Sequence, residues 1–149
     1  MAARRQLVGS GGPFEAKYGY SRAVRVGDHV AVAGTAAFKD GAPVAPGDAA
    51  AQTRHILGVM EQALAEAGAS FGDVIRYRVF VTDIADFEAV ATELGNVFSA
   101  IRPAGTLVGN STIVHPDLVV EIEMDAIIGS SSSVGNVGTE AVSLDQISS

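Results

Sequence analysis

Hydrophobic residues recur every three or four positions in two long segments, which predicts two amphipathic helices. The first helix is expected from Ala49 to Ala67, with Asp48 as its N-cap and Gly68 just after its C-terminus. The second covers about residues 86–100 and ends before Pro103, which blocks further helix. Each helix has one apolar stripe, so each must pack against another layer of structure.

Other segments alternate apolar with polar residues, or are rich in β-branched residues, as strands are. We expect strands at about residues 18–26, 29–35, 74–82, 105–114 and 118–128, and a short edge strand near residues 6–8. Gly27-Asp28 is typical of a tight hairpin turn between the first two long strands. A short polar turn is expected to join the last two strands in a second hairpin.

The order of the long elements is β-β-α-β-α-β-β, which indicates an α+β fold with both helices on one face of a sheet. The strand at 74–82 then has two faces. One would carry Ile75, Tyr77, Val79 and Val81, and the other Val74, Arg76, Arg78 and Phe80. A chain of 149 residues has no third layer to cover the second face. Self-association into a closed ring is therefore expected.

The composition changes abruptly after residue 128. Residues 1–128 are predicted to form a single domain, and residues 129–149, GSSSSVGNVGTEAVSLDQISS, a Ser/Gly-rich tail. Such low-complexity composition favours disorder. The alternative is that the few apolar residues of the tail dock on a neighbouring surface.

Charge and composition restrict the classes of function. The net charge of −7 disfavours nucleic-acid binding, and no basic stripe is present. The absence of cysteine excludes disulfides and thiolate chemistry, and three scattered histidines do not predict a metal site. No apolar run is long enough to cross a membrane, and no secretory signal is recognisable. A cytoplasmic protein that needs no metal is therefore expected.

Several segments together resemble the Rid (YjgF-type) family, some members of which are called L-PSP endoribonucleases. These segments are YGYSRAVRVGDHVAVAGTAAF (18–38), the first helix (52–68), FGDVIRYRVFVTDIADF (71–87) and RPAGTLVGNSTIVHPDLVVEIEMDAII (102–128). The resemblance implies a chorismate-mutase-like fold and a homotrimer with ligand clefts between subunits. It also implies hydrolysis of reactive imines and enamines, such as 2-aminoacrylate, without any cofactor.

The same resemblance suggests site residues. Glu121 matches the family glutamate that positions the attacking water, and Tyr20 stands where the family often has a cleft tyrosine. The family's Ser-Gly pair is Ala33-Gly34 here, so one substrate-contacting hydroxyl is missing, although Thr35 follows. We expect these residues to line a substrate site.

Gly105 marks a departure from the family. It occupies the place of the arginine that clamps a substrate carboxylate in the Pro-Ala-Arg step. Because glycine supplies neither charge nor orientation, we expect weak or no activity on 2-aminoacrylate and a bulkier or less acidic substrate. Thr106 and Asn110, on one face of the predicted penultimate strand, could donate hydrogen bonds to that substrate. For Glu123, a plain position on the wet face of the last strand is favoured.

The leading hypothesis is a Rid-type enzyme that hydrolyses a reactive imine, enamine or enol-like intermediate. A cyclase or tautomerase on the same scaffold is an alternative, since a fold does not determine one chemistry. Another alternative is a non-catalytic trimer that binds a small molecule. An RNA-cleaving protein is disfavoured by the acidic composition.

Overall fold

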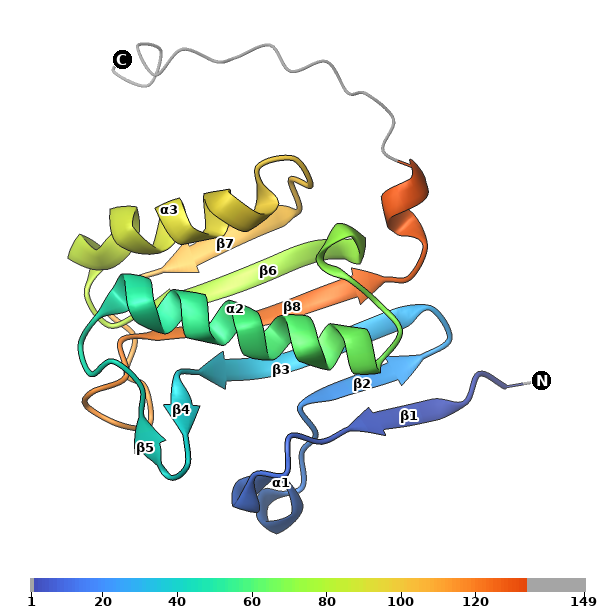
Figure 1. Cartoon of the computed structure of the whole chain (residues 1–149), viewed down its shortest axis with the longest axis horizontal. Coiled ribbons are helices and arrows are strands. Elements are labelled where there is room, and N and C mark those ends of the chain that lie inside the picture. The colour runs from blue at the N-terminus through green and yellow to red at the C-terminus, as the bar shows by residue number, and fades with distance from the viewer. Residues whose placement is uncertain (1, 134–149) are drawn as a thin grey trace.

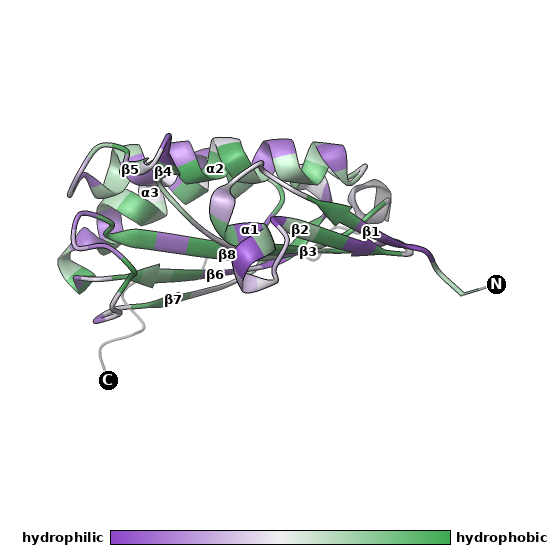
Figure 2. Ribbon diagram, turned by 90° about the horizontal axis from the view of Figure 1, so that it is seen from below, coloured by the Kyte–Doolittle hydropathy of each residue, from purple (hydrophilic) through white to green (hydrophobic). Residues whose placement is uncertain are grey.

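The computed structural model describes residues 2–133, in which two long helices cover one face of a six-stranded sheet (Figures 1 and 2). Across the sheet the strands are β1 (Arg5–Val8), β2 (Ala23–Val26), β3 (His29–Ala36), β8 (Val120–Ile127), β6 (Val74–Val81) and β7 (Ala104–Val108). The covering helices are α2 (Ala49–Glu66) and α3 (Phe87–Phe98). The smaller elements are α1 (Pro13–Tyr18), the β4 (Phe38–Lys39) and β5 (Ala42–Pro43) pair, and the 3₁₀ helices η1 (Phe71–Asp73), η2 (Ile84–Asp86) and η3 (Ser130–Ser133).

The ends of α2 follow the predicted signals. The Asp48 carboxylate accepts a hydrogen bond from the backbone N–H of Ala51 at 3.0 Å, as an N-cap does. Beyond the helix, Gly68 has a φ of +86°, a conformation that glycine adopts without strain. Both predicted helices are present, and the ends of α2 and α3 lie within two residues of the expected bounds.

The core lies between the helices and the sheet. From the sheet it receives every second residue of β8, with Ile122 and Met124 at the centre, and from α2 it receives Ile56, Met60 and Leu64. All five are almost completely shielded from water, so each contributes roughly 1.5–3 kcal/mol of burial free energy. Among residues 2–133, both long helices lie on this one side of the sheet, and neither covers the opposite face (Figure 2).

The predicted closing hairpin is wrong. Strands β7 and β8 are not neighbours, because β6 lies between them and pairs with β7 in parallel and with β8 antiparallel. Helix α3 makes the connection that a parallel β6–β7 pair requires. The chain then crosses from β7 to β8 through residues 109–119, and Leu118 from this segment is buried in the core.

Three local predictions also need correction. Residues 18–22 are not a strand, since Pro13 begins α1 and Gly19, at φ +76°, ends it. Strand β7 ends at Val108 rather than at residue 114, and Asn110 lies in the following loop with a φ of +56°. A register shift against β8 between Val74 and Arg76 buries Val74 and leaves Ile75 exposed, opposite to the expected alternation.

Past the predicted domain boundary at residue 128, η3 remains attached to the fold. The backbone N–H of Gly129 donates to the buried carboxylate of Asp73 at 3.0 Å, and the Ser130 hydroxyl donates to the Asp73 carbonyl at 3.2 Å. The division into domain and tail stays a prediction, because residues 134–149 lie outside the described part of the chain. Between residues 2 and 133, no helix is long and apolar enough to span a membrane.

Candidate functional site

Acidic side chains follow the uncovered face of β8, at every second position of the strand. Glu121, Glu123 and Asp125 alternate with buried residues and so point away from α2 and α3. On the neighbouring β6, Arg78 is paired in register with Glu123. The carboxylates therefore lie near the middle of the sheet, on the face that the described residues 2–133 leave uncovered.

Glu123 and Asp125 have partners on this face. Arg78 Nη1 lies 2.9 Å from Glu123 Oε1 and 3.8 Å from Asp125 Oδ2. His29 Nε2 lies 3.3 Å from Asp125 Oδ1. Glu123 is therefore part of a cross-strand ion pair. Such a structural role fits the non-catalytic surface position that the sequence favoured for Glu123.

Glu121 differs from its two neighbours on the strand. Within residues 2–133 its carboxylate has no hydrogen-bond or ion-pair partner, although the residue is half-buried. Burial raises the pKa of Glu121 above the ordinary value of 4.5; the positive charge of Arg22 opposes this rise, and the negative charge of Glu123 adds to it. Such a carboxylate is able to accept a proton more readily than an exposed one.

A bulge in β3 creates the space that Glu121 occupies. Between the pairs Val32–Met124 and Thr35–Ile122, two residues of β3, Ala33 and Gly34, stand against one residue of β8. A Cβ at Gly34 would lie only 2.9 Å from Glu121 Oε1. The absence of a side chain at this position is thus what admits the carboxylate.

Arg22 is a member of this group that the sequence pattern did not reveal. Its Nη2 donates to the carbonyl of Gly34 at 2.8 Å, and its guanidinium carbon lies 5.9 Å from the ring centre of Tyr20. Its backbone carbonyl accepts from the N–H of Ala33 at 2.9 Å. No spacing in the sequence points to Arg22, because its place depends on the bulge in β3. Tyr20, Arg22, Ala33, Gly34 and Glu121 together are called the Glu121 group below.

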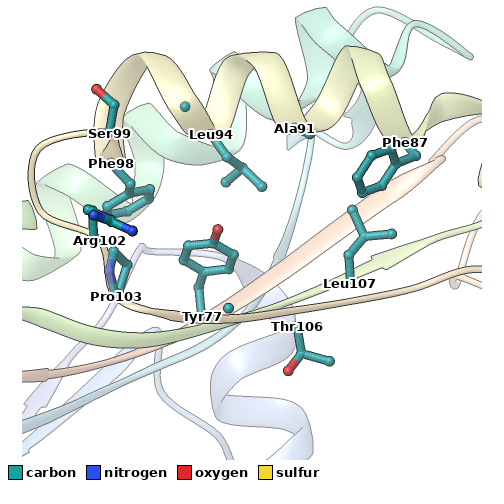
Figure 3. Close-up of a pocket in the computed structure, with 12 residues that line it drawn as sticks. Tyr77, Phe87, Ala91, Leu94, Phe98, Ser99, Arg102, Pro103, Thr106 and Leu107 are labelled. Atoms are coloured by element: carbon teal, nitrogen blue, oxygen red, sulfur yellow. The ribbon is translucent and has the colours of Figure 1, made fainter. Parts of the chain in front are cut away.

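The remaining predicted site residues lie elsewhere. Thr35 is 1% exposed and faces the core, where its hydroxyl donates to the Ala33 carbonyl at 2.9 Å. Gly105 pairs with Tyr77, and its Cβ position lies against the Tyr77 ring on the helix side of the sheet. Thr106 points to the other side of β7 (Figure 3). Asn110 lies in the exposed loop beyond the strand. Within one chain the structure therefore places Gly34 and its bulge neighbour Ala33 beside Glu121, and Tyr20 near Arg22. It leaves Gly105 on the opposite face of the sheet.

Gly105 borders a cavity of its own, between α3 and the β6–β7 edge of the sheet (Figure 3). The volume is about 460 Å³, and apolar side chains of α3 such as Phe87 and Leu94 line much of the wall. We call it the α3–β7 pocket. The ring of Tyr77 covers the place of the missing side chain, since a Cβ at Gly105 would lie 2.7–2.8 Å from three Tyr77 atoms.

Residues 2–133 contain no group of three or more histidine, cysteine or acidic side chains arranged to hold a metal ion. The potential chemistry of the described chain therefore rests on a half-buried, unpaired carboxylate beside a guanidinium, and on a separate apolar pocket with a few polar groups.

Comparison with known proteins identifies the family to which this chain belongs. The family model described as Endoribonuclease L-PSP matches residues 12–128. The uncharacterized protein SCO2049 of Streptomyces coelicolor is 37% identical over 132 residues, which covers 89% of this chain and 97% of the relative. The 3-aminoacrylate deaminase RutC of Acinetobacter baylyi is 41% identical over 76 residues, 51% of this chain and 60% of RutC.

Solved structures agree with the family match. Rv2704 from Mycobacterium tuberculosis, described as a member of the YjgF/YER057c/UK114 family, superposes with a TM-score of 0.76 at 44% identity and covers 84% of this chain and all of its own. PA3499 from Pseudomonas aeruginosa, described as a protein of unknown function, has a TM-score of 0.74 at 29% identity, with 85% and 94% covered. The chain belongs to the Rid family, also called YjgF/YER057c/UK114, as the sequence resemblance indicated.

Proposed function

We propose that this protein is a cofactor-independent enzyme that hydrolyses a reactive imine or enamine, in clefts between the subunits of a homotrimer. Membership of the Rid family supports this class of reaction, as does the partial match to RutC, a relative named for the deamination of an enamine. The main structural support for the proposal is the environment of the Glu121 carboxylate. It is the one acidic residue of β8 that is half-buried and has no partner within residues 2–133.

Glu121 would act as the base for an attacking water. In its ionised form the carboxylate accepts a proton from water while the water oxygen adds to the carbon of the N-protonated imine, which gives a neutral carbinolamine. Glu121 then returns this proton to the nitrogen, the C–N bond breaks, and ammonia leaves while the hydroxyl group gives up its own proton and becomes the carbonyl. The product is the corresponding ketone or keto acid. An enamine enters the same sequence after its carbon is protonated to give the imine.

The separation of the two candidate sites supports an assembly. The Glu121 group lies on the uncovered face of the sheet, whereas the α3–β7 pocket lies on the helix side of its edge strand. One chain cannot present both to the same small molecule across its own sheet. A second copy packed against the uncovered face would bring the Glu121 group of one subunit to the β7 edge of another, as family membership leads us to expect.

Turnover by matched variants tests the proposal. An amino-acid oxidase supplies imines from leucine or phenylalanine, and trapping with semicarbazide measures the imine that remains. We expect the protein to accelerate imine loss and Glu121→Gln to lose at least about 100-fold of the rate, as general-base catalysis contributes about 10²–10⁴. Glu123→Gln is the control and should retain most of the activity. Equal rates in wild type and Glu121→Gln would refute the role of Glu121.

The substrate preference follows from Gly105. Without a guanidinium at this position, we expect slow hydrolysis of 2-aminoacrylate, which the formation of pyruvate measures directly. Fast pyruvate formation, comparable to the rate on the larger imines, would contradict this expectation.

The alternative is a trimer that binds a small molecule without turnover. The unpaired Glu121 favours catalysis, because a half-buried carboxylate without a partner is less favourable than an exposed one and binding alone does not require it. A protein that binds imines or keto acids, but leaves the rate of imine loss unchanged for all substrates tested, would support the alternative. Cleavage of RNA is disfavoured by the net charge of −7, and titration with a labelled single-stranded RNA at moderate salt checks it.

A further inference from the structure

The α3–β7 pocket has the size and lining of a small-molecule site. Its volume of about 460 Å³ falls within the range of roughly 300–1,000 Å³ that is typical of ligand pockets. Small residues on α3, Ala91 and Gly95, leave room opposite β7, and Phe87, Leu94 and Leu107 provide apolar walls. On the sheet side, the Tyr77 ring lies over Gly105, which has no side chain of its own.

One end of this pocket is cationic. Arg102 lines it at the end formed by Phe98 and Pro103 (Figure 3). Its backbone N–H donates to the carbonyl of Phe98 at 2.8 Å, and its φ of +55° turns the chain sharply from α3 towards β7. The guanidinium has no hydrogen-bond or ion-pair partner anywhere in residues 2–133. It is therefore available to an anion.

Tyr77 adds a hydroxyl beside this cationic end. The ring lies over Gly105, and the hydroxyl points away from the sheet towards α3 (Figure 3). No partner for this hydroxyl lies within residues 2–133. The pocket thus combines apolar walls with two unpaired donors, the guanidinium of Arg102 and the hydroxyl of Tyr77.

We propose that the α3–β7 pocket binds a monoanion with a compact apolar or aromatic body, whose charged group meets Arg102 and Tyr77. Three residues before the glycine, Arg102 supplies the positive charge that position 105 lacks. Tyr77 occupies the space above Gly105, so the ligand body lies further along α3, against Leu94 and Phe87. If the protein is the proposed enzyme, the matching substrate class is the imine of a bulky apolar 2-oxo acid. This assignment of a substrate class rests on the proposed function.

Benzoate and benzamide test the charge, since they share a ring and differ in ionisation. Titration of the full chain, followed by the backbone amide signals of Gly95 and Gly105 in ¹H–¹⁵N spectra, reports binding at the pocket. We expect benzoate to shift these signals and to bind at least about threefold more tightly than benzamide, as a partly exposed charge-assisted contact gives. Failure of benzoate to shift these signals would overturn the proposal.

Variants separate charge from shape. Arg102→Met should weaken benzoate about three- to tenfold and leave benzamide unchanged, and Arg102→Lys should recover part of the loss. Ala91→Leu, which fills the pocket, should weaken both ligands. Arg4→Met is the control, because Arg4 lies next to the opposite edge of the sheet, and it should bind benzoate as wild type does. Equal benzoate affinity in wild type and Arg102→Met would refute the role of Arg102.

Glu121→Gln distinguishes failure of this inference from failure of the proposed function. It should still bind benzoate in a way that depends on Arg102, while losing imine hydrolysis. Normal benzoate binding that depends on Arg102, in a protein without hydrolytic activity, would keep the pocket proposal and reject the enzyme. The opposite result is hydrolysis that depends on Glu121 and not on Arg102, with equal benzoate affinity in wild type and Arg102→Met. That result would keep the proposed enzyme and reject the pocket proposal.

Discussion

The carboxylate of Glu121 lies against the backbone of Gly34, so that a methyl group at Gly34 would stand 2.9 Å from Oε1 and 3.3 Å from the carboxyl carbon. The same glycine offers its carbonyl to Arg22 at 2.8 Å. One residue without a side chain therefore positions both charged groups. The bulge in β3 makes this possible, because it removes Ala33 and Gly34 from regular pairing.

Gly34→Ala should displace the Glu121 carboxylate, since the new methyl group would lie closer than real Cβ contacts allow. We expect a loss of hydrolytic rate of about 10- to 100-fold, as small misplacements of catalytic groups cause. Gly58→Ala is the matched control. Gly58 is exposed on α2 with nothing within 4 Å of the new methyl, so this change should leave activity intact and stabilise the fold by about 0.5–1 kcal/mol. Full activity in Gly34→Ala would contradict the proposed position of the carboxylate.

The rate should fall on acidification at a pH above that expected for an exposed glutamate. Burial raises the pKa of Glu121 above 4.5, and only the ionised form accepts a proton from water. Because Arg22 opposes this rise, Arg22→Met should move the acid limb of the pH–rate profile to higher pH, whereas Arg22→Lys should move it less. Thermal unfolding of each variant controls for structural damage. An unchanged acid limb in Arg22→Met would show that the two charges do not interact.

Glu121→Gln should stabilise the protein near neutral pH while it removes activity. A carboxyl group whose pKa is higher in the folded than in the unfolded state makes folding less favourable as pH rises through that range. The neutral amide lacks this penalty, so we expect a higher Tm than in wild type at pH 7 and a smaller difference at pH 4. A lower Tm at pH 7 would indicate that the ionised carboxylate has a stabilising partner, such as a group from another subunit.

Gly105→Arg would introduce the arginine that the family resemblance predicts at this position, and we expect that it does not create the function of that arginine. The Cβ at this position would lie 2.7–2.8 Å from the Tyr77 ring, so the substitution should cost about 1–3 kcal/mol of unfolding free energy. Tyr77→Ala combined with Gly105→Arg should cost less than the sum of the two single changes. Urea denaturation of the four proteins in the cycle measures this coupling, and strictly additive effects would argue against contact between the two residues.

Asp73→Ala should destabilise the fold by about 2 kcal/mol at neutral pH, because Asp73 is 6% exposed and accepts from Ser70 and Gly129. Burial tends to raise the pKa of Asp73, but backbone hydrogen bonds from Ser70, Gly129 and Ser131 together hold it below 3.8. Its contribution is thus complete above pH 3.8 and is lost as the pH falls through the lower, folded-state pKa.

Urea denaturation at pH 7 and pH 3 checks this prediction, with Asp83→Ala as the control. Asp83 is an exposed cap of η2 and accepts from Ala85 at 2.9 Å, so its loss should cost less, about 0.5–1 kcal/mol. Equal costs for the two substitutions would mean that the attachment of η3 to Asp73 adds nothing to stability.

The elements of the fold were largely predictable from local pattern. The periodicity of α2 and α3, the cap at Asp48 and the Gly27-Asp28 turn are all local signals, and the structure contains each of them. Besides the three local corrections, the main failure was non-local. Nothing within residues 102–128 indicates that β6 separates β7 from β8, because both a hairpin and a crossover bury the same alternating residues.

The candidate site also has features that local sequence predicts and features that depend on non-local contacts. The amino-acid order alone was enough to identify the family and the acidic positions on β8, since these depend on residue type and spacing. The loss of a family arginine at position 105 stays a prediction. Folding decided which of the carboxylates is unpaired, how Arg22 reaches Gly34, and that Tyr77 covers Gly105. Those contacts join residues that are 12 to 87 positions apart, and a register shift of one residue in β3 or β6 would undo them.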